Sequence, residues 1–411
     1  MKQQSLRLGW AMWLIAALFY ALDYFQHTAP SVLIEPIAHT LKVNYTIIGN
    51  IMGIYFPLYA LSQLPAGYCL DKFGIRITLT LACFIVSLGL LISSSPSLFA
   101  LTLGRILIAI GSAAAFLGAL KTASIWLPKY LFPLAVGLTN TIGVIGGLFG
   151  QPFLNHVIEQ STWQHALVTI ALFGFLLTAV ILTLLRGKSE KRGLMESPIN
   201  ILPILSIKNL WYLALYAGIM VGTVVNAFSE LYDVVFLKHS HHVTTQAAAS
   251  ISSMIFIGIA VGGPLHGLIA QCFRQKHHWM VIANTMTILL FTLIVYSSKT
   301  PLTPSLLYPL YFTVGFFVSS MLLAFTYARQ YYPHKIHATS FALINMVIGL
   351  CGFFFQELLG AILLYFKQHT HTDDHHVMFF YSFWVLLIPL IISWVLCLRL
   401  REPPASQERM R

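Results

Sequence analysis

Charged side chains are scarce in this sequence. Only 9% of its 411 residues are Asp, Glu, Lys or Arg, whereas about 25% is usual in soluble proteins. Hydrophobic residues make up 57%. A soluble chain of this length folds into several domains, and each needs a polar shell. The shortage of charge therefore excludes an ordinary soluble enzyme and a disordered protein, and it indicates that lipid surrounds most of the surface.

Cysteine pairs and nucleotide-binding motifs are also missing. The five cysteines include no CxxC pair, which argues against a disulfide scaffold and a zinc site. No GxxxxGK[ST] phosphate loop is present, which argues against direct drive by ATP. The 24 Lys and Arg outnumber the 13 Asp and Glu, but they lie in short segments between apolar runs. That distribution is typical of a membrane protein, so no nucleic-acid partner is expected.

Long apolar runs recur from Gly9 to Leu398. A membrane-spanning helix needs about 20 such residues. The first run continues to about Leu33, past the length of a signal peptide, so a retained span is expected. The sequence predicts an all-α integral membrane protein with twelve spans, near 9–33, 45–69, 75–95, 98–123, 132–156, 164–186, 209–237, 246–270, 279–297, 305–328, 339–365 and 377–398.

The cations outside the spans give the orientation. An even number of spans places both termini on one side, and this side holds eighteen Lys and Arg: Lys2, Arg7, Lys72, Arg76, Lys129, Arg186, Lys188, Lys191, Arg192, Lys208, Arg274, Lys276, Arg329, Lys335, Arg399, Arg401, Arg409 and Arg411. The opposite side holds four: Lys42, Lys238, Lys299 and Lys367. Because cytoplasmic loops are enriched in Lys and Arg, both termini are predicted to be cytoplasmic, in a plasma membrane of the bacterial inner-membrane type.

The longest polar segment, from Arg186 to Lys208, divides the chain into halves. The predicted domains are an N-terminal six-helix bundle (1–186), a cytoplasmic linker (187–208) and a C-terminal six-helix bundle with a short cytoplasmic tail (209–411). The halves match weakly at a fixed offset, as in Pro128, Asn140, Gly147 and Gln151 against Pro333, Asn345, Gly352 and Gln356. Two parallel six-span repeats are a transporter architecture, with the site near the midplane; chance similarity is the alternative.

The connection between the second and third spans carries the most specific motif. It reads GYCLDKFGIRIT, and the motif positions are Gly67, Asp71, Lys72, Gly74 and Arg76. Glycine permits close helix approach and tight turns. Asp71 can accept hydrogen bonds from N–H groups at a helix start or pair with a cation across the domain interface. This spacing closely resembles motif A of the major facilitator superfamily; a plain basic turn is the alternative.

The resemblance covers about residues 9–398 and implies the major facilitator fold of two pseudo-symmetric six-helix bundles. It also implies that the motif A loop helps to hold a cytoplasmic gate closed. The second-half copy has Gln271 in place of the acid and Arg274 in place of the second glycine, so the charged contact is expected in the first half. The segment after Arg105 resembles motif B in part. Glycines in the fifth span resemble antiporter motif C without its core, which leaves helix packing as their expected role.

Ionisable side chains inside the spans are the candidate substrate and proton site, since each costs about 2.5–3.5 kcal/mol to insert. Tyr20, Asp23, Tyr24 and His27 share one face of the first span. Burial disfavours a charged carboxylate, and histidine titrates near neutrality. Asp23 and His27 are therefore candidate proton carriers, with a fixed structural pair as the alternative.

Arg105 in the fourth span lies at a depth similar to Glu230 in the seventh and Glu357 in the eleventh. Either acid is a candidate partner, and an Arg105–Glu230 pair would bridge the halves. The guanidinium fork also suits a carboxylate or phosphate on a substrate, so both roles stay open. Lys121 points nearly opposite to Arg105 on a straight helix, toward either the inner cavity or the cytoplasm.

Polar positions in the second half extend the candidate cavity. Asn226 and Glu230 continue with Asp233 at helical spacing, and Asp233 is expected to be solvated near the surface. Gln356 forms a pseudo-symmetric pair with Gln151, and helix-interface hydrogen bonds are the favoured role for both.

Histidines gather in the predicted outer segments. They are His239, His241 and His242, followed by HTHTDDHH at 369–376. No ligand geometry follows from this spacing, so solvated, pH-sensitive loops are favoured over a metal site.

These observations predict a secondary active transporter, not an enzyme, which acts as a monomer without a cofactor or resident metal. The expected substrate is a small anionic or zwitterionic solute, moved by alternating access and coupled to protons through Asp23, with Glu230 or Glu357 as second choice. The alternatives are a proton-driven exporter of amphipathic compounds and a receptor or sensor that binds without transport. The linker and tail are too short for a folded signalling domain, which counts against the receptor.

Overall fold

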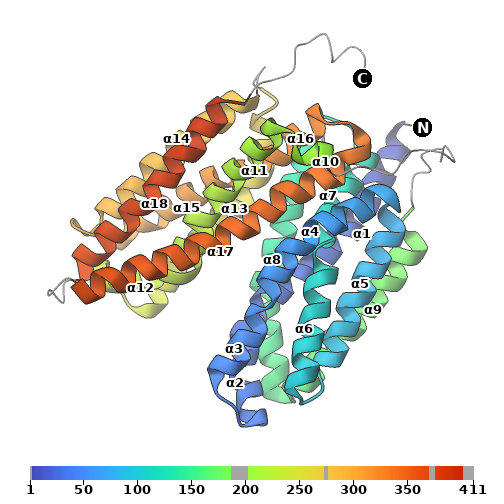
Figure 1. Ribbon diagram of the computed structural model, residues 1–411, viewed down its shortest axis with the longest axis horizontal. Coiled ribbons are helices and arrows are strands. Elements are labelled where there is room, and N and C mark those ends of the chain that lie inside the picture. Colours follow the sequence, from blue (N-terminus) through green and yellow to red (C-terminus); the bar gives the residue numbers. More distant parts are fainter. Residues whose placement is uncertain (1, 187–201, 273–275, 370–374, 401–411) are drawn as a thin grey trace. The chain divides into compact units, whose positions relative to one another are not determined.

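The computed structural model describes residues 2–186, 202–272, 276–369 and 375–400 (Figure 1). These residues form helices joined by short connections, with no strand among them. Twelve helical segments in this part of the chain are long and apolar enough to cross a membrane, and each overlaps one predicted span. The chain is therefore a multi-pass integral membrane protein of the all-α class, which confirms the predicted fold class.

Contacts divide the chain into two compact units. The first comprises 1–204 and 332–342, and the second comprises 205–331 and 343–411. Segment 332–342, which the sequence assigns to the C-terminal bundle, thus has its contacts in the first unit. Most of the predicted linker, 187–201, lies outside the described residues, so the domain boundaries stay a prediction.

The first unit contains α1 (Lys2–Thr28), α2 (Pro30–Leu41), α3 (Tyr45–Gly53), α4 (Tyr55–Lys72), α5 (Ile75–Ser93), α6 (Leu98–Ser112), α7 (Ala115–Trp126), α8 (Phe132–Gln160), α9 (Trp163–Leu184) and η3 (His334–Ile336). The second contains α11 (Lys208–Met220), η1 (Val221–Tyr232), α12 (Asp233–His241), α13 (Thr245–Ile269), α14 (Lys276–Tyr296), α15 (Pro304–Val318), η2 (Ser319–Leu322), α16 (Leu323–Tyr331) and α18 (His375–Leu398). The short α10 (Leu202–Leu205) and the long α17 (His337–His369) contribute residues to both.

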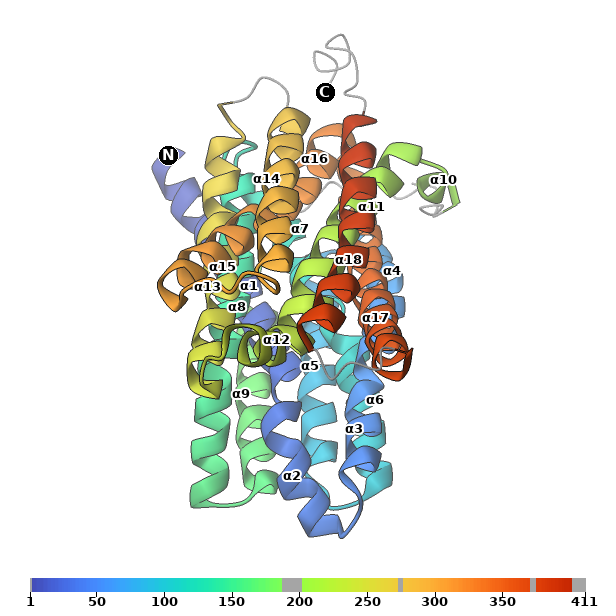
Figure 2. The same ribbon diagram turned by 90° about the vertical axis from the view of Figure 1, so that its left-hand side faces the viewer.

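In the first unit α5 lies between α6 and α9, as both views show (Figures 1 and 2). The span made of α6 and α7 is 78% buried, against 28% for α9, so the former is central. α1 packs against α7 and α8. A Cβ added at Gly146 of α8 would lie 2.5 Å from the Ala21 carbonyl oxygen, so glycine permits this approach. The packing fixes α1, which carries Asp23.

Two prolines interrupt the helices of this unit. The first span was expected to run to about Leu33, but α1 ends at Thr28 and α2 begins at Pro30. In the second span α3 ends at Gly53, four residues before Pro57. Proline has no N–H, and its ring clashes with the carbonyl four residues earlier. Both breaks leave main-chain carbonyls near the middle of the unit available to other donors.

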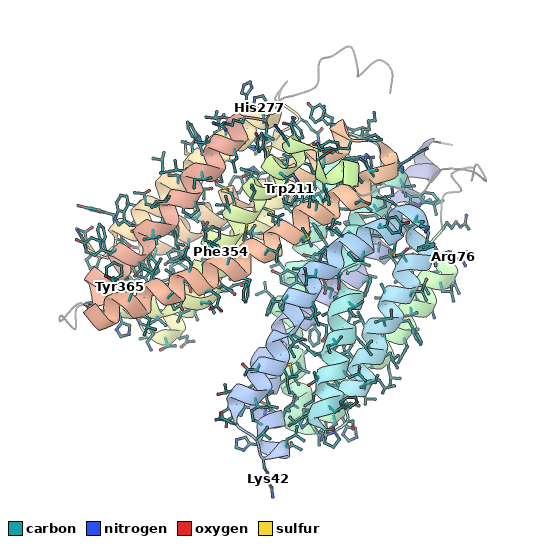
Figure 3. All side chains as sticks on the ribbon, in the orientation of Figure 1. Lys42, Arg76, Trp211, His277, Phe354 and Tyr365 are labelled. Atoms are coloured by element: carbon teal, nitrogen blue, oxygen red, sulfur yellow. The ribbon has the colours of Figure 1, made fainter. Side chains whose placement is uncertain are left out.

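Lys42, Arg76, His277 and Tyr365 lie toward the ends of their units (Figure 3). Lys42, between α2 and α3, and Arg76, at the start of α5, lie at opposite ends of the first unit. This placement agrees with the alternation of loops that twelve spans require. In the second unit His277 lies near the start of α14 and Tyr365 near the far end of α17 (Figure 3).

In the second unit α13 packs against α15, and α14 and α11 pack against α18. The seventh span runs from Lys208 to His241 and is α-helical at its two ends, but its middle, η1, is a π-helix. Hydrogen bonds in a π-helix join residues five apart, and such segments are rare and frequent at functional sites. Side chains on η1 therefore depart from the α-helical spacing that the sequence suggests.

His266 joins three helices of the second unit. Its side chain on α13 is fully buried. Trp279 Nε1 on α14 donates to His266 Nδ1 at 2.9 Å, and His266 Nε2 lies 2.7 Å from the carbonyl oxygen of Phe316 on α15. Because Nδ1 accepts, the proton of the neutral ring is on Nε2, which donates to Phe316.

Replacing His266 with leucine is expected to destabilise the protein by about 1–3 kcal/mol, because the Trp279 N–H and the Phe316 carbonyl lose their buried partner. His266→Gln, which can still donate and accept, should melt closer to wild type. Thermal unfolding in detergent, followed by tryptophan fluorescence, measures both. Equal melting temperatures for His266→Leu and wild type would contradict a stabilising role.

Candidate functional site

Asp23 is the centre of a buried polar cluster in the first unit. Its side chain on α1 is 0% exposed. The hydroxyl of Tyr55, the first residue of α4, donates to Asp23 Oδ1 at 2.8 Å. Ser112, at the end of α6, lies beside both groups. Hydroxyl groups can donate to a carboxylate and can accept from a carboxylic acid, so this cluster suits either protonation state of Asp23.

Arg105 on α6 belongs to the same cluster. It is 4% exposed, and its Nε and Nη1 donate to the carbonyl oxygens of Met52 and Gln26 at 3.1 and 3.3 Å. The guanidinium carbon lies 4.5 Å from the ring centroid of Tyr55, a cation–π arrangement. Among the described residues Nη2 has no hydrogen-bond partner. The side chain thus holds a fixed orientation and keeps donors available.

Pro30 explains why the Gln26 carbonyl is available to Arg105. In a continuous helix the Gln26 carbonyl would accept from residue 30, but Pro30 has no N–H. The Met52 carbonyl lies in the last turn of α3, at the break before α4, and the carbonyl that Pro57 leaves without its helical donor is that of Gly53. Sequence reasoning identified Arg105 and missed both acceptors, although a proline four residues after Gln26 was a readable signal.

Aromatic side chains surround this cluster. Tyr20 is buried and meets Tyr24 edge-on at 5.9 Å between ring centroids, and Phe116 at 4.9 Å. Tyr59 stacks on Tyr55 at 5.4 Å. The structure therefore brings Tyr20, Asp23 and Tyr24 of the predicted face together. The side chain of His27 lies outside the described residues, so its role stays a prediction.

The motif A acid, Asp71, holds the start of α17. Its side chain is fully buried and pairs with Lys121 of α7, with 2.9 Å between Oδ1 and Nζ. The main-chain N–H groups of Ala338 and Thr339 donate to Asp71 at 3.1 and 2.8 Å, and the Thr339 hydroxyl donates at 2.8 Å. All of these residues belong to the first unit. A carboxylate at a helix N-terminus satisfies donors that the helix leaves open. We call this set the Asp71 clamp.

Lys121 lies in the clamp and not beside Arg105. The sequence placed it either toward the inner cavity or at the cytoplasmic surface. Instead it is buried, pairs with Asp71, and donates to the His334 carbonyl at 2.8 Å. The fourth span is also not straight, because α6 ends at Ser112 and α7 starts at Ala115. Arg105 and Lys121 belong to separate sites, as the sequence predicted. The pairing of Lys121 with Asp71 was not predicted.

The other motif A residues shape the clamp and its surroundings. A Cβ added at Gly67 would lie 2.6 Å from Ala342 Cβ and 2.8 Å from the Ala338 carbonyl oxygen, so only glycine allows α17 this close. Gly74 precedes α5 with a φ of +83°, a conformation that favours glycine. Arg76 donates from Nε and Nη2 to the Leu182 carbonyl near the end of α9. Lys72 is exposed, 5.2 Å from the ring centroid of Tyr68.

In the second unit the structure brings together Asn226 and Glu230, with Gln356 from α17. Asn226 Nδ2 donates to Glu230 Oε2 at 2.9 Å, and Gln356 Nε2 donates to the Asn226 carbonyl at 3.2 Å. Gln356 therefore links α17 to η1. Glu230 and Glu357 are exposed in the chain. Pairing of either acid with Arg105 stays a prediction.

Asp233 corrects the sequence analysis. It was expected to be solvated, but it is 1% exposed and accepts from the Ser229 hydroxyl at 3.3 Å. The expectation placed Asp233 near the surface end of the seventh span. That span continues as α12 to His241, and α12 packs against α13 and α18, which encloses Asp233.

His241 also departs from the expectation for the outer loops. It is buried; the Leu302 N–H donates to its Nδ1 at 3.2 Å, and its Nε2 lies 3.1 Å from Ser297 Oγ. It therefore ties the end of α12 to the connection after α14 and is not a solvated loop residue. The segment 370–374 and the side chains of 369–376 lie outside the described residues. Within the described part of the chain no group of three or more His, Cys, Asp or Glu is placed to hold a metal.

The family follows from a sequence profile described as Major Facilitator Superfamily, which matches residues 13–355 and 231–410. The chain belongs to this superfamily. The resemblance that the motif A loop suggested is thereby confirmed.

Three relatives are similar to parts of this superfamily member. The uncharacterized transporter YybO of Bacillus subtilis (strain 168) is 28% identical over 206 residues, 48% of this chain and 47% of that protein. The Probable galactarate/D-glucarate transporter GarP of Escherichia coli (strain K12) is 22% identical over 46% of this chain and 44% of that protein. The Probable L-galactonate transporter of Escherichia coli (strain K12) is 28% identical over 39% and 36%. The matches thus span less than half of each relative.

Solved structures of the superfamily share the fold. The proton:xylose symporter XylE has a TM-score of 0.74 at 13% identity and covers 96% of both chains. FucP has a TM-score of 0.62 at 14% identity and covers 93% of this chain and 98% of that one. At these identities the likeness describes the fold alone.

Proposed function

We propose that this superfamily member transports a sugar acid or a related small organic anion by alternating access, together with protons. In this proposal both termini are cytoplasmic, as the distribution of Lys and Arg suggests. The single observation that carries the proposal is Arg105, a nearly fully buried cation with an Nη2 that has no partner among the described residues.

A buried guanidinium with available donors is suited to bind a carboxylate. Its planar fork matches two carboxylate oxygens, and charge-assisted hydrogen bonds are about twice as strong as neutral ones. Gln26 offers a second buried donor, because its Nε2 also lacks a partner in the described residues. Tyr24 and Tyr59, both half-buried, add aromatic faces and hydroxyl groups near the cluster. This combination suits a polyhydroxylated anion.

Asp23 supplies the proton coupling in this proposal. The charge of Arg105 acts on Asp23, so the two groups nearly neutralise each other when Asp23 is ionised. A proton taken up by Asp23 leaves Arg105 with an uncompensated positive charge in a buried site, which is costly. A substrate carboxylate restores neutrality. The proton therefore favours anion binding, which is the thermodynamic requirement for symport.

The relatives support the substrate class. Their names describe transporters of galactarate/D-glucarate, L-galactonate, hexuronate and sulfoacetate. These compounds are all small anions with a carboxylate, and most carry several hydroxyl groups. A common carboxylate would meet Arg105, and the remaining polar groups would set the selectivity between them.

Purified protein in proteoliposomes tests the proposal. With an inwardly directed proton gradient, uptake of radiolabelled D-glucarate is expected to be saturable and to collapse on addition of a protonophore. Unlabelled galactarate, L-galactonate, glucuronate and sulfoacetate should compete, whereas the neutral polyol D-glucitol should not. Identical vesicles without protein provide the background.

Two results would overturn this function. If D-glucarate binds to the protein but none of the anions moves under any gradient, the protein is a receptor. If uptake is absent and an amphipathic dye is extruded instead, the exporter is supported.

A further inference from the structure

The three aspartates that the structure describes are all buried, but their partners differ. Asp71 has a lysine and three further donors. Asp23 has the Tyr55 hydroxyl and the charge of Arg105. Asp233 forms no ion pair with any described residue, and the groups close to it are hydroxyls. Neither the superfamily match nor the substrate cluster of the first unit accounts for this third acid.

Three hydroxyl groups from three elements converge on Asp233. Ser229 of η1 donates to its Oδ2 at 3.3 Å, and Ser252 of α13 lies within hydrogen-bonding reach. Tyr311 of α15 is 0% exposed, its hydroxyl has no hydrogen-bond partner among the described residues, and it acts electrostatically on Asp233. A buried phenol next to a carboxylate is a polar group whose natural partner is that carboxylate.

The charged and titratable groups around Asp233 leave it without a cation. α12 packs against η1, α13 and α18. Glu230 of η1 is the nearest charged group, and it is an acid. Tyr232 of η1 and Tyr311 are the nearby phenols, and α18 presents Phe379 and Phe383 to α12 through Phe236. On α12 itself Lys238 is exposed and His241 is engaged by Leu302 and Ser297.

We propose that Asp233 is a second proton-binding carboxylate, which takes up and releases a proton in the second unit separately from Asp23. An ionised carboxylate that is buried without a cation is strongly disfavoured, and such a group binds a proton instead. The step is a simple protonation: one proton from water joins one carboxylate oxygen, and the unit gains one positive charge. Surrounding hydroxyls suit both forms, because each can donate to the carboxylate or accept from the acid. A lysine partner, as in the Asp71 clamp, suits only the ionised form.

The proton site at Asp233 bears on the proposed transport function through the number of protons transported. If transport is proton-coupled as proposed above, protonation of Asp233 adds to the number of protons that enter with each substrate. The proton-binding site itself is independent of any substrate, so it can be tested on the protein alone.

Infrared spectroscopy of the full chain in lipid vesicles, without substrate, tests the site. A protonated carboxylic acid has a carbonyl stretching band separate from that of a carboxylate. Spectra of wild type, Asp233→Asn and Glu35→Gln are recorded across a pH series. Glu35 is the matched control, because it is an exposed acid on α2. At neutral pH the acid band should be smaller in Asp233→Asn than in wild type, and unchanged in Glu35→Gln.

A band of wild-type size in correctly folded Asp233→Asn would overturn the proposal. If that variant does not fold, Tyr311→Phe replaces it: the acid stays, but a neighbouring hydroxyl that interacts with it electrostatically is removed. The band should then shift in frequency and in the pH at which it disappears. A Tyr311→Phe spectrum identical to wild type at every pH would equally overturn the proposal.

A transport measurement separates failure of this inference from failure of the proposed function. Proton entry per D-glucarate is measured with an internal pH dye, alongside D-glucarate exchange without a proton gradient. Asp233→Asn should lower the proton-to-substrate ratio and retain exchange. An unchanged proton-to-substrate ratio would show that Asp233 does not contribute to proton coupling. If wild type shows no D-glucarate flux, the proposed function fails and the infrared result alone decides the proton site.

Discussion

Replacing Arg105 with alanine is expected to weaken D-glucarate binding by about 10–100-fold. The lost interaction is a hydrogen bond to a charged group, worth about 1.5–3 kcal/mol, and each 1.4 kcal/mol is about tenfold in affinity. Uptake should fall by at least the same factor. Arg105→Lys keeps the charge but not the planar fork, so an intermediate loss is expected. Calorimetric titration of the purified variants with D-glucarate, together with proteoliposome uptake, measures both effects.

A second variant separates substrate binding from structural pairing, the two roles that the sequence left open for Arg105. Arg105→Ala alone leaves Asp23 buried without its cation, which destabilises the first unit. The double variant Asp23→Asn/Arg105→Ala removes both charges and should recover thermal stability. If it also recovers D-glucarate affinity, Arg105 is structural and the substrate site lies elsewhere. If affinity stays low, Arg105 binds the substrate.

Asp71→Asn is the second change with a large expected effect. Asparagine keeps the size but removes the charge, so Lys121 is left buried without its counterion, and breaking such a pair costs about 3–5 kcal/mol. The clamp then holds α17 more weakly, and the turnover rate should fall more than tenfold. A tenfold fall corresponds to an increase of about 1.4 kcal/mol in the activation free energy. D-glucarate affinity should stay near the wild-type value, because the hydrogen bonds and ion pair of Asp71 involve none of the residues that contact Arg105. Initial uptake rates and calorimetric affinities distinguish the two effects.

Graded variants make this result specific to the clamp. Thr339→Val removes one of several donors to Asp71 and should have a smaller effect than Asp71→Asn. Asp71→Asn/Lys121→Met should be less impaired than the sum of the single changes, because neither charge is then left alone. Turnover of Asp71→Asn at the wild-type rate would mean that the clamp has no part in the transport cycle.

The sequence predicted the spans well because twenty apolar residues in a row have few other uses. Each predicted span overlaps a helical segment of the structure, and the cations mark the loops. The consequences of the helix breaks within the spans were harder to predict. Pro30 is visible in the sequence, but its consequence is the release of the Gln26 carbonyl toward Arg105, a residue 79 positions away in the chain.

The candidate site was predictable where a motif fixes spacing and less so where tertiary contacts decide. Asp71 was identified as an acceptor at a helix start or a partner of a cation across the domain interface. The structure shows the first role, and the cation with which Asp71 pairs, Lys121, lies in the same unit. Its partner Lys121 was assigned elsewhere, because a pairing between distant spans leaves no local pattern. Asp233 was misplaced because it was taken to lie near the surface, whereas tertiary packing of α12 against α13 and α18 buries it.

The two sides of the Asp71 clamp depend to different degrees on which side chain is present. One side is a carboxylate, which a single codon change removes. The other consists largely of the N–H groups of Ala338 and Thr339, which every amino acid except proline supplies. Because Ala338 is fully buried, only small residues other than proline can replace it while this contact is kept. Covariation between residues is therefore not expected to detect the contact of Asp71 with these N–H groups. A side-chain substitution at that helix start is also not expected to compensate for a change at Asp71.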